Sequence, residues 1–168
     1  MTPVLETPRL ALRELTSADD GFILELLNEP SFLQHIGDKG VRTREDARGY
    51  IEAGPRASYA RHGFGLLAVA LRESGETIGI CGLLKRDALE DPDVGFAFLP
   101  RHWSKGYAFE SASAVLQHAR AALGLTRILA ITSPDNTASI QLLGRLGFRF
   151  ERVQRLSADD EVKVFASR

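Results

Sequence analysis

Three short segments of this chain are apolar at nearly every position, namely residues 64–71, 78–84 and 127–132. A strand with one face in water alternates apolar and polar residues, whereas a strand covered on both faces is almost continuously apolar. The three segments therefore predict a central sheet with helices on both sides, in a layered α/β domain. Residues 73–76 combine glycine with polar residues, so the first two segments are expected to form a hairpin.

The other elements follow from periodicity and from residues that start or end helices. Residues 9–15 alternate apolar and polar side chains, as a half-buried strand does. Residues 30–42 contain two glycines and indicate an irregular loop after Pro30 stops a helix. Further strands are expected at residues 94–99, 148–153 and 162–165. Helices are expected at residues 17–28, 106–123 and 135–146, the first of them capped by Ser17. Another helix is expected to begin at Thr43 and to bend or break at Gly54-Pro55.

Composition excludes several classes of protein. The chain has 168 residues, of which 44% are hydrophobic and 26% charged, which is typical of one folded globular domain over residues 1–168. The 21 Lys and Arg residues nearly balance the 22 Asp and Glu residues, so the charge does not indicate nucleic acid or an anionic membrane as partner. No apolar run approaches 18 residues and no leader pattern opens the chain, so we expect a cytoplasmic protein.

Cysteine and histidine usage give little sign of disulfide or metal chemistry. Cys81 is the single cysteine, which excludes an internal disulfide, and it lies in an apolar strand-like run. We interpret it as a small buried apolar side chain. The four histidines show no ligand spacing, so no metal site is expected.

The most unusual local feature is a basic segment directly before the helix expected at 106–123. It reads Arg101-His102-Trp103-Ser104-Lys105-Gly106-Tyr107-Ala108. Cations are disfavoured at a helix N-terminus by a few tenths to about 1 kcal/mol, and an anion bound to the free amides would remove this conflict. Gly106 would let the backbone approach such an anion closely. The segment therefore predicts a phosphate or pyrophosphate site, with an ordinary loop carrying solvated charges as the alternative.

Two familiar nucleotide motifs do not match. A P-loop ends in Gly-Lys followed by Ser or Thr, whereas here Lys105 precedes Gly106. A dinucleotide fingerprint needs three spaced glycines that open a helix, and Gly63-x-Gly65 lacks the third glycine and opens a strand.

The basic segment resembles the acetyl-coenzyme A pyrophosphate loop of the GNAT N-acetyltransferase superfamily. The motif of that loop is Q/R-x-x-G-x-G/A, and this chain has Trp103-x-x-Gly106-x-Ala108. Trp at the first position is similar to the branch of ribosomal-protein N-terminal acetyltransferases (RimJ/RimL-like), where glycine is often found in place of Ser104. Residues 7–13, 93–100 and 136–148 resemble further segments of that branch, in the same order.

The resemblance implies a GNAT-like domain with a mixed, mostly antiparallel sheet of about six or seven strands and about four flanking helices. It also implies that the sheet splays beside residues 94–99, so that an extended arm of the cofactor pairs with free backbone groups there. Phe98 and Leu99 are expected to face this arm. The implied contacts to the rest of acetyl-CoA come from Trp103, Ser104, Lys105, Gly106, Tyr107, Ala108 and Asn136.

The helix expected at 135–146 carries two candidate site residues. Ser139 shares a helix face with Leu142 and Leu143, and a hydroxyl on a buried face needs a partner. That partner is either the helix's own backbone or, as the resemblance implies, the sulfur of coenzyme A. Asn136 is well placed to cap the helix, a role compatible with contact to the pantetheine arm.

The implied reaction is acetyl transfer from acetyl-CoA to a primary amine, of a protein N-terminus or a small molecule, by direct attack in a ternary complex. A backbone amide near Leu99 would stabilise the developing oxyanion, and Ser139 the departing thiolate. Asp93 is a candidate general base, with a water chain or a plain turn residue as alternatives. By analogy, residues 30–45 and 156–161 line the acceptor site. The rival interpretations are a non-catalytic acyl-CoA-binding module and a purely structural domain; a homodimer is common in the superfamily.

Overall fold

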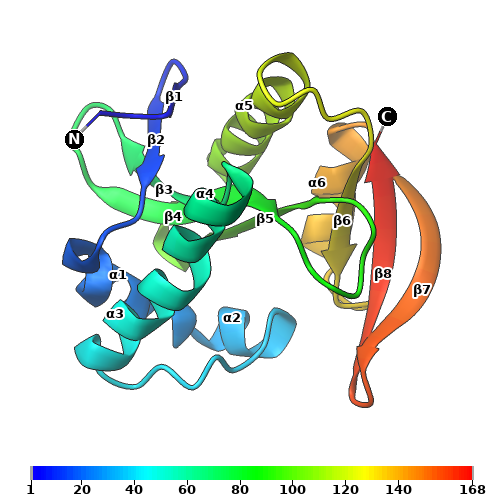
Figure 1. The fold of residues 1–168 in the computed structure, drawn as a ribbon, viewed down its shortest axis with the longest axis horizontal. Helices are drawn as coiled ribbons and strands as arrows, with labels where there is room; N and C mark the ends of the chain where they lie inside the picture. Colours follow the sequence, from blue (N-terminus) through cyan, green and yellow to red (C-terminus); the bar gives the residue numbers. More distant parts are fainter. Residues whose placement is uncertain (1, 168) are drawn as a thin grey trace.

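Eight strands form one sheet in the structure, a computed structural model that describes residues 2–167 (Figure 1). The strand order is β1-β2-β3-β4-β5-β6-β8-β7, and neighbours are antiparallel except β5 and β6, which are parallel. The strands are β1 (Leu5–Glu6), β2 (Leu10–Glu14), β3 (Leu66–Leu71), β4 (Thr77–Leu84), β5 (Asp93–Phe98), β6 (Ile128–Thr132), β7 (Arg149–Ser157) and β8 (Asp160–Ser167).

Helices connect and cover these strands. The α-helices are α1 (Asp20–Leu27), α2 (Pro30–His35), α3 (Arg44–Ile51), α4 (Ala57–His62), α5 (Tyr107–Ala121) and α6 (Thr137–Arg145). Short 3-10 helices span Ser17–Asp19 and Pro100–His102, and a π-helical turn spans Glu52–Arg56. The predicted class, a layered α/β fold with a mixed sheet, is confirmed. The described residues contain one strand more than the predicted upper number, β1, and two helices more, α2 and α4.

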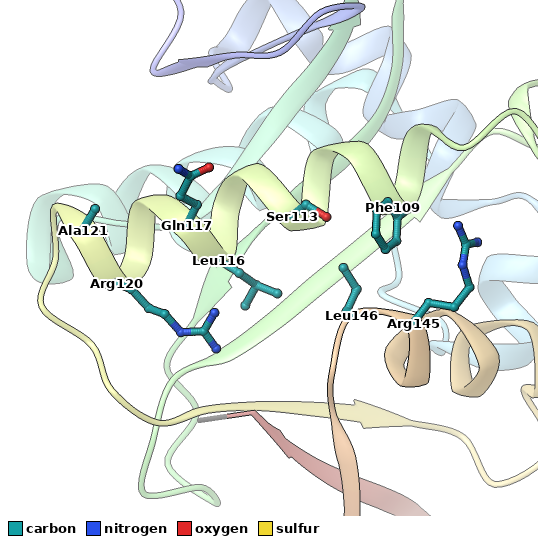
Figure 2. Close-up of a pocket in the computed structure, with 8 residues that line it drawn as sticks. All are labelled: Phe109, Ser113, Leu116, Gln117, Arg120, Ala121, Arg145 and Leu146. Carbon is teal, nitrogen blue, oxygen red and sulfur yellow. The ribbon is translucent and has the colours of Figure 1, made fainter.

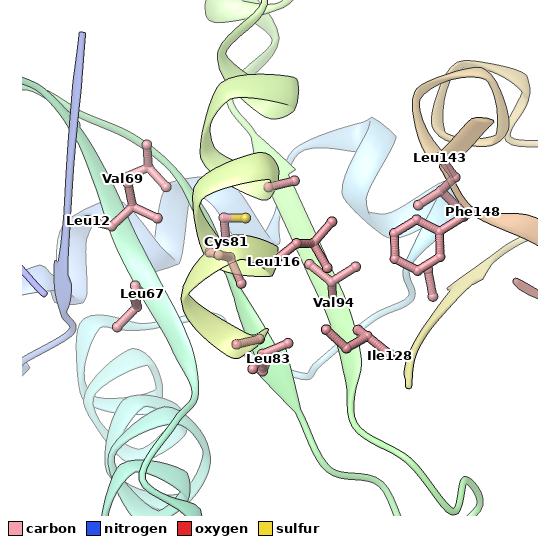
Figure 3. Packing of buried hydrophobic residues seen from close by; sticks show 14 of the residues in the cluster. Leu12, Leu67, Val69, Cys81, Leu83, Val94, Leu116, Ile128, Leu143 and Phe148 are labelled. Atoms are coloured by element: carbon pink, nitrogen blue, oxygen red, sulfur yellow. The ribbon is translucent and has the colours of Figure 1, made fainter. Parts of the chain in front are cut away.

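The continuously apolar strands are buried on both faces, as predicted. Leu67 and Val69 of β3 belong to a cluster that includes residues of α5 and α6, whereas Ala68 between them belongs to a cluster with α1 and α3. Figure 3 shows Leu116 of α5 and Cys81 of β4 among the residues of the first of these clusters. Cys81 has no exposed surface, in agreement with its interpretation as a small core residue.

The first helix ends at Asn28, its C-cap, as predicted, but its start and the segment that follows it differ from the sequence prediction. Thr16, not Ser17, is the N-cap, because its side chain accepts from the Ala18 amide while the Asp19 carboxylate accepts from the Thr16 amide. Pro30 occupies the first position of α2 instead of lying in a loop. Proline fits a first helical position, where no intrahelical partner for its missing N–H is needed. The expectation of an irregular loop over residues 30–42 is therefore wrong for Pro30–His35.

The predicted interruption at Gly54-Pro55 is observed in a specific form. The helical path continues, but through the π-helical turn Glu52–Arg56 that contains Pro55. Thr43 caps α3, as predicted, since its hydroxyl accepts from the Asp46 amide at 3.0 Å. The pair α3–α4 thereby forms one nearly continuous helical segment on the face opposite α5 (Figure 1).

Candidate active site

Strands β5 and β6 are neighbours in the sheet but diverge along their length, which leaves an opening between them (Figure 1). Within the described residues they are paired only where Asp93 lies opposite Leu129, next to a hydrogen bond of 2.9 Å from the Leu129 amide to the Pro92 carbonyl. On its other side β5 is paired with β4 along its whole length. One edge of β5 is therefore open beyond Asp93, as the resemblance implied.

The ladder between β4 and β5 determines which backbone groups face this opening. The Leu99 amide donates to the Ile78 carbonyl at 3.0 Å. Since successive residues of a strand direct their N–H and C=O groups to opposite sides, those of Val94, Phe96 and Phe98 face the open edge. The carbonyl of Phe98 accepts a hydrogen bond of 2.8 Å from the Trp103 indole, which leaves the Phe98 N–H as the donor at this end of the opening.

Leu99 does not face the opening, and this corrects the expectation for it. Its side chain has no exposed surface and packs in the cluster with α1 and α3. Its amide donates to Ile78 and its carbonyl accepts from the His102 amide at 2.9 Å. The backbone amide nearest to Leu99 that faces the opening is that of Phe98, one residue earlier, because the direction of backbone groups alternates along a strand.

The loop after β5 presents backbone amides around Lys105. Ser104 and Gly106 both have left-handed backbone conformations, with φ of 62° and 82°. Gly106 is the N-cap of α5, and the first intrahelical bond there runs from the Glu110 amide to its carbonyl at 3.0 Å. The amides before Glu110 lack intrahelical acceptors. Such a set of amides at a helix N-terminus suits an anion.

The charges of this loop are partly neutralised, which revises the argument made from sequence. Arg101 forms ion pairs with Glu25 at 2.9 Å and Glu76 at 3.5 Å, and His102 contacts Glu76 at 3.1 Å. The hydrogen bond from His102, followed by the contributions of Arg101, lowers the pKa of Glu76. Of the three basic residues, only Lys105 has no carboxylate partner in the described chain, so the conflict with the helix dipole is confined to Lys105.

Arg9, just before β2, holds the loop from the side. Its Nε lies 2.7 Å from Glu110 Oε1, and its Nη1 donates to the Lys105 carbonyl at 2.9 Å. The guanidinium also stacks on the Tyr107 ring, 4.5 Å from the centroid. Burial would raise the pKa of Glu110, but hydrogen bonds from Thr7 and Arg9 outweigh it and hold the pKa below its usual value. The sequence indicated none of these contacts, since they join residues about a hundred positions apart.

Two shallow grooves run beside α5, and one of them reaches this loop at Gly106. One, of about 540 Å³, is lined in part by Arg9, Gly106 and Glu110. The other, of about 520 Å³, lies between α5 and the end of α6 (Figure 2). Phe109 and Arg145 line both grooves, and the Arg145 guanidinium lies 4.7 Å from the centre of the Phe109 ring. An extended ligand bound at the loop could continue along this surface.

The end of β6 contains an unsatisfied polar atom. Thr132 Oγ1 is buried and has no hydrogen-bond partner among the described residues. A buried hydroxyl without a partner costs about 1–3 kcal/mol, so this atom indicates a ligand that completes it. Asn136 follows closely and caps α6, with its Oδ1 accepting from the Ser139 amide at 3.3 Å. Ser139 itself is half-buried in the first turn of α6.

Comparison with known proteins decides the family. The family model described as "Acetyltransferase (GNAT) domain" matches residues 9–149. This chain belongs to the GNAT acetyltransferase family. It is 32% identical over 157 residues to an uncharacterized N-acetyltransferase, YoaA, of Bacillus subtilis, an alignment that covers 92% of this chain and 88% of that protein.

Solved structures of GNAT proteins have the same fold. An acetyltransferase from Agrobacterium tumefaciens str. C58 superposes with a TM-score of 0.82 at 27% identity, covering 100% of this chain and 95% of the other. RimL, named as a ribosomal L7/L12 alpha-N-protein acetyltransferase and solved with coenzyme A, superposes with a TM-score of 0.84 at 16% identity, covering 99% and 97%.

As a GNAT member the chain is an acyltransferase, and its acetyl donor is acetyl-CoA. The residues present fit this donor: the β5 edge offers backbone groups for amides, the loop offers amides and Lys105 for a pyrophosphate, and Thr132 offers an unsatisfied hydroxyl. In residues 2–167 no three His, Cys, Asp or Glu side chains gather where they could hold a metal ion, and no helix is long and apolar enough to cross a membrane.

Asp93, the candidate general base, has a structural position in this GNAT domain. Its side chain is 1% exposed and pairs with Arg86, whose Nε lies 3.1 Å from Oδ1. Burial raises the pKa of Asp93, while Arg86 opposes the rise. Asp93 also lies at the one point where β5 and β6 are paired. The geometry therefore favours a role for Asp93 in holding the junction of the two strands, away from solvent.

Proposed function

We propose that this GNAT protein acetylates a primary amine by direct attack on acetyl-CoA in a ternary complex. The observation that carries the proposal is the open edge of β5, which leads to an amide-lined loop at the N-terminus of α5. This arrangement can bind an extended thioester by its own amides and by its phosphates at the same time. When bound, acetyl-CoA supplies an activated acyl group, so no metal or covalent enzyme intermediate is required.

In this proposal, different residues bind the pyrophosphate, stabilise the acetyl oxygen and assist the leaving sulfur. The amides of residues 104–108 and the Lys105 ammonium bind the pyrophosphate, and Trp103 fixes the loop to the end of β5 through its bond to Phe98. The Phe98 N–H points into the opening and stabilises negative charge on the acetyl oxygen. Asn136 orders the first turn of α6 next to the arm, and the Ser139 hydroxyl donates to the leaving sulfur.

We assign the acceptor to the class of primary amines and favour a peptide α-amine over a small-molecule amine. The fold is shared with RimL, whose name specifies the α-amine of a protein, and several of the sequence segments resemble that branch. The acceptor approaches from the side of α2 and of the β7–β8 turn, because α5 and α6 occupy the other face of the sheet.

A thermal melt tests the donor, and a panel of amines tests the reaction. At a ligand concentration 100 times the Kd, binding stabilises the fold by about 2.7 kcal/mol. For a domain of this size the melting temperature rises by about 5–11 °C. We expect this shift with acetyl-CoA and coenzyme A but not with ATP or NAD, and free thiol release with peptides bearing a free α-amine but not with their Nα-acetylated forms. A shift without thiol release from any amine would instead identify a non-catalytic acyl-CoA-binding module.

A further inference from the structure

A histidine of the segment 30–45, to which no individual role has been given above, lies beside the end of β6. His35 is the last residue of α2, and its Nδ1 lies 3.2 Å from Ser133 Oγ. Ser133 directly follows Thr132, which ends β6. Asp135 Oδ1 lies 3.9 Å from the same ring nitrogen, and the His35 side chain is 25% exposed. The imidazole is therefore anchored at one nitrogen and reachable by solvent.

The end of β6 separates two environments. Ile128 and Ala130 pack in the cluster with α5 and α6, while Leu129 between them packs on the opposite face. Side chains alternate between the faces of a strand, so Thr132 points toward the α5–α6 side. Ser133, just beyond the strand, contacts His35 of α2. The unsatisfied Thr132 hydroxyl and the imidazole of His35 thus lie on opposite faces at the same end of the same strand.

We propose that His35 is the general base that removes a proton from the acceptor ammonium, an inference that rests on the proposed acetylation of a primary amine. A primary amine is protonated at neutral pH and cannot attack a carbonyl until it loses that proton. Histidine is the side chain best suited to exchange protons near neutral pH. Asp93, the other candidate, is buried and paired with Arg86.

The proton balance of the step is simple. His35 takes one proton from the ammonium at Nε2, which is free to accept when Nδ1–H donates to Ser133 Oγ. The nitrogen lone pair forms the C–N bond to the acetyl carbon, and the C–S bond breaks with its electron pair on sulfur. The second proton of the nitrogen neutralises that thiolate by way of Ser139, and the proton on His35 passes to solvent.

The test compares two histidines that end helices of equal length. His35 ends the six-residue helix α2 and His62 ends the six-residue helix α4, where it stacks on Phe64. His35→Asn keeps an N–H donor for Ser133 but has no basic nitrogen, and His62→Asn is the matched control. Turnover is measured by thiol release with an octapeptide bearing a free α-amine and with spermidine, and coenzyme A binding by calorimetry.

We expect His35→Asn to lower kcat at least about 100-fold, the usual contribution of a general base, with the Kd for coenzyme A within threefold of wild type. Added imidazole should restore part of the turnover of His35→Ala, which a merely structural role would not allow. His62→Asn should match wild type.

Turnover of His35→Asn within threefold of His62→Asn would overturn the assignment of His35 and leave the proposed function intact. If His35→Asn instead loses coenzyme A binding or unfolds at a lower temperature, the assignment is tested by adding imidazole to His35→Ala. A His35→Ala protein that binds coenzyme A but gains no turnover from imidazole overturns the assignment. A wild-type protein that acetylates no amine of the panel refutes the proposed function, and the role of His35 with it.

Discussion

Replacing Gly106 by alanine tests the loop most directly. Gly106 has φ of +82°, a conformation that costs an L-residue about 1–2 kcal/mol. A Cβ there would lie 3.2 Å from Arg9 Nη2, the flexible end of a side chain, which can move by a few tenths of an ångström. The expected loss of stability is therefore that of the backbone strain alone, which lowers the melting temperature by about 2–8 °C for a domain of this size.

Gly63 provides a matched control for that strain. It has φ of +76° at the end of α4, and a Cβ added there would meet no atom within 4 Å. Gly63→Ala should therefore lose about as much stability as Gly106→Ala. The two differ in what the methyl group would face, because only Gly106 lies at the N-terminus of α5. If the methyl group prevents one amide from reaching a phosphate, about 1.5–3 kcal/mol is lost, which weakens coenzyme A binding about 10- to 150-fold.

Calorimetric titration with coenzyme A and thermal melts of both variants measure the two effects separately. We expect similar melting temperatures and a much larger Kd for Gly106→Ala. A Kd for Gly106→Ala within threefold of that for Gly63→Ala would refute the reasoning, because the backbone at Gly106 would then not approach the phosphates.

Three further predictions address other parts of the site and the core. The lowered pKa of Glu110 stabilises the fold at pH values above the pKa of an unfolded glutamate, about 4.3, and this stabilisation is lost as the pH falls through the folded value. The difference in melting temperature between wild type and Glu110→Gln should therefore shrink in melts below about pH 4. Ser139→Ala should lower kcat with little change in the Kd for coenzyme A; unchanged turnover would remove Ser139 from the mechanism. Burial raises the pKa of Cys81 to about 12, so iodoacetamide at pH 8 should label Cys81, as followed by mass spectrometry, only after denaturation.

Much of the sheet could be predicted because its signals are local. The continuous apolar runs of β3 and β4 and the residues of the turn between them lie within about 20 positions, and both strands form where expected. Pro30 shows the limit of such local reasoning. A proline can follow the end of one helix or occupy the first position of the next. Here α1 already ends before Pro30, because the Asn28 side chain donates to the Leu24 and Val41 carbonyls, and Pro30 begins α2.

The site was predictable as a set of segments but not as a set of contacts. From sequence, Arg101 and His102 count as basic residues at a helix end. Their ion-pair partners Glu25 and Glu76 lie far away in the sequence, so these pairs could not be predicted. Neither the burial of Asp93 nor its position at the junction of β5 and β6 could be predicted from the residues near it in the sequence. Electrostatic arguments from sequence count charges correctly, but they cannot pair charges that only the fold brings together.

Donor and acceptor sides of this GNAT domain are built by different parts of the chain. The loop for the donor depends on Arg9, Phe98 and Gly106, which lie in the segments that resemble the family. The proposed acceptor side depends on α2, a helix that the sequence did not indicate and that carries His35, the proposed base. Since Thr132 at the end of β6 faces the side of α5 and α6, while Ser133 just beyond it contacts α2, changes in α2 can alter the acceptor without disturbing the donor. Variants in α2 should therefore change the KM for the amine and kcat, while the Kd for coenzyme A stays constant.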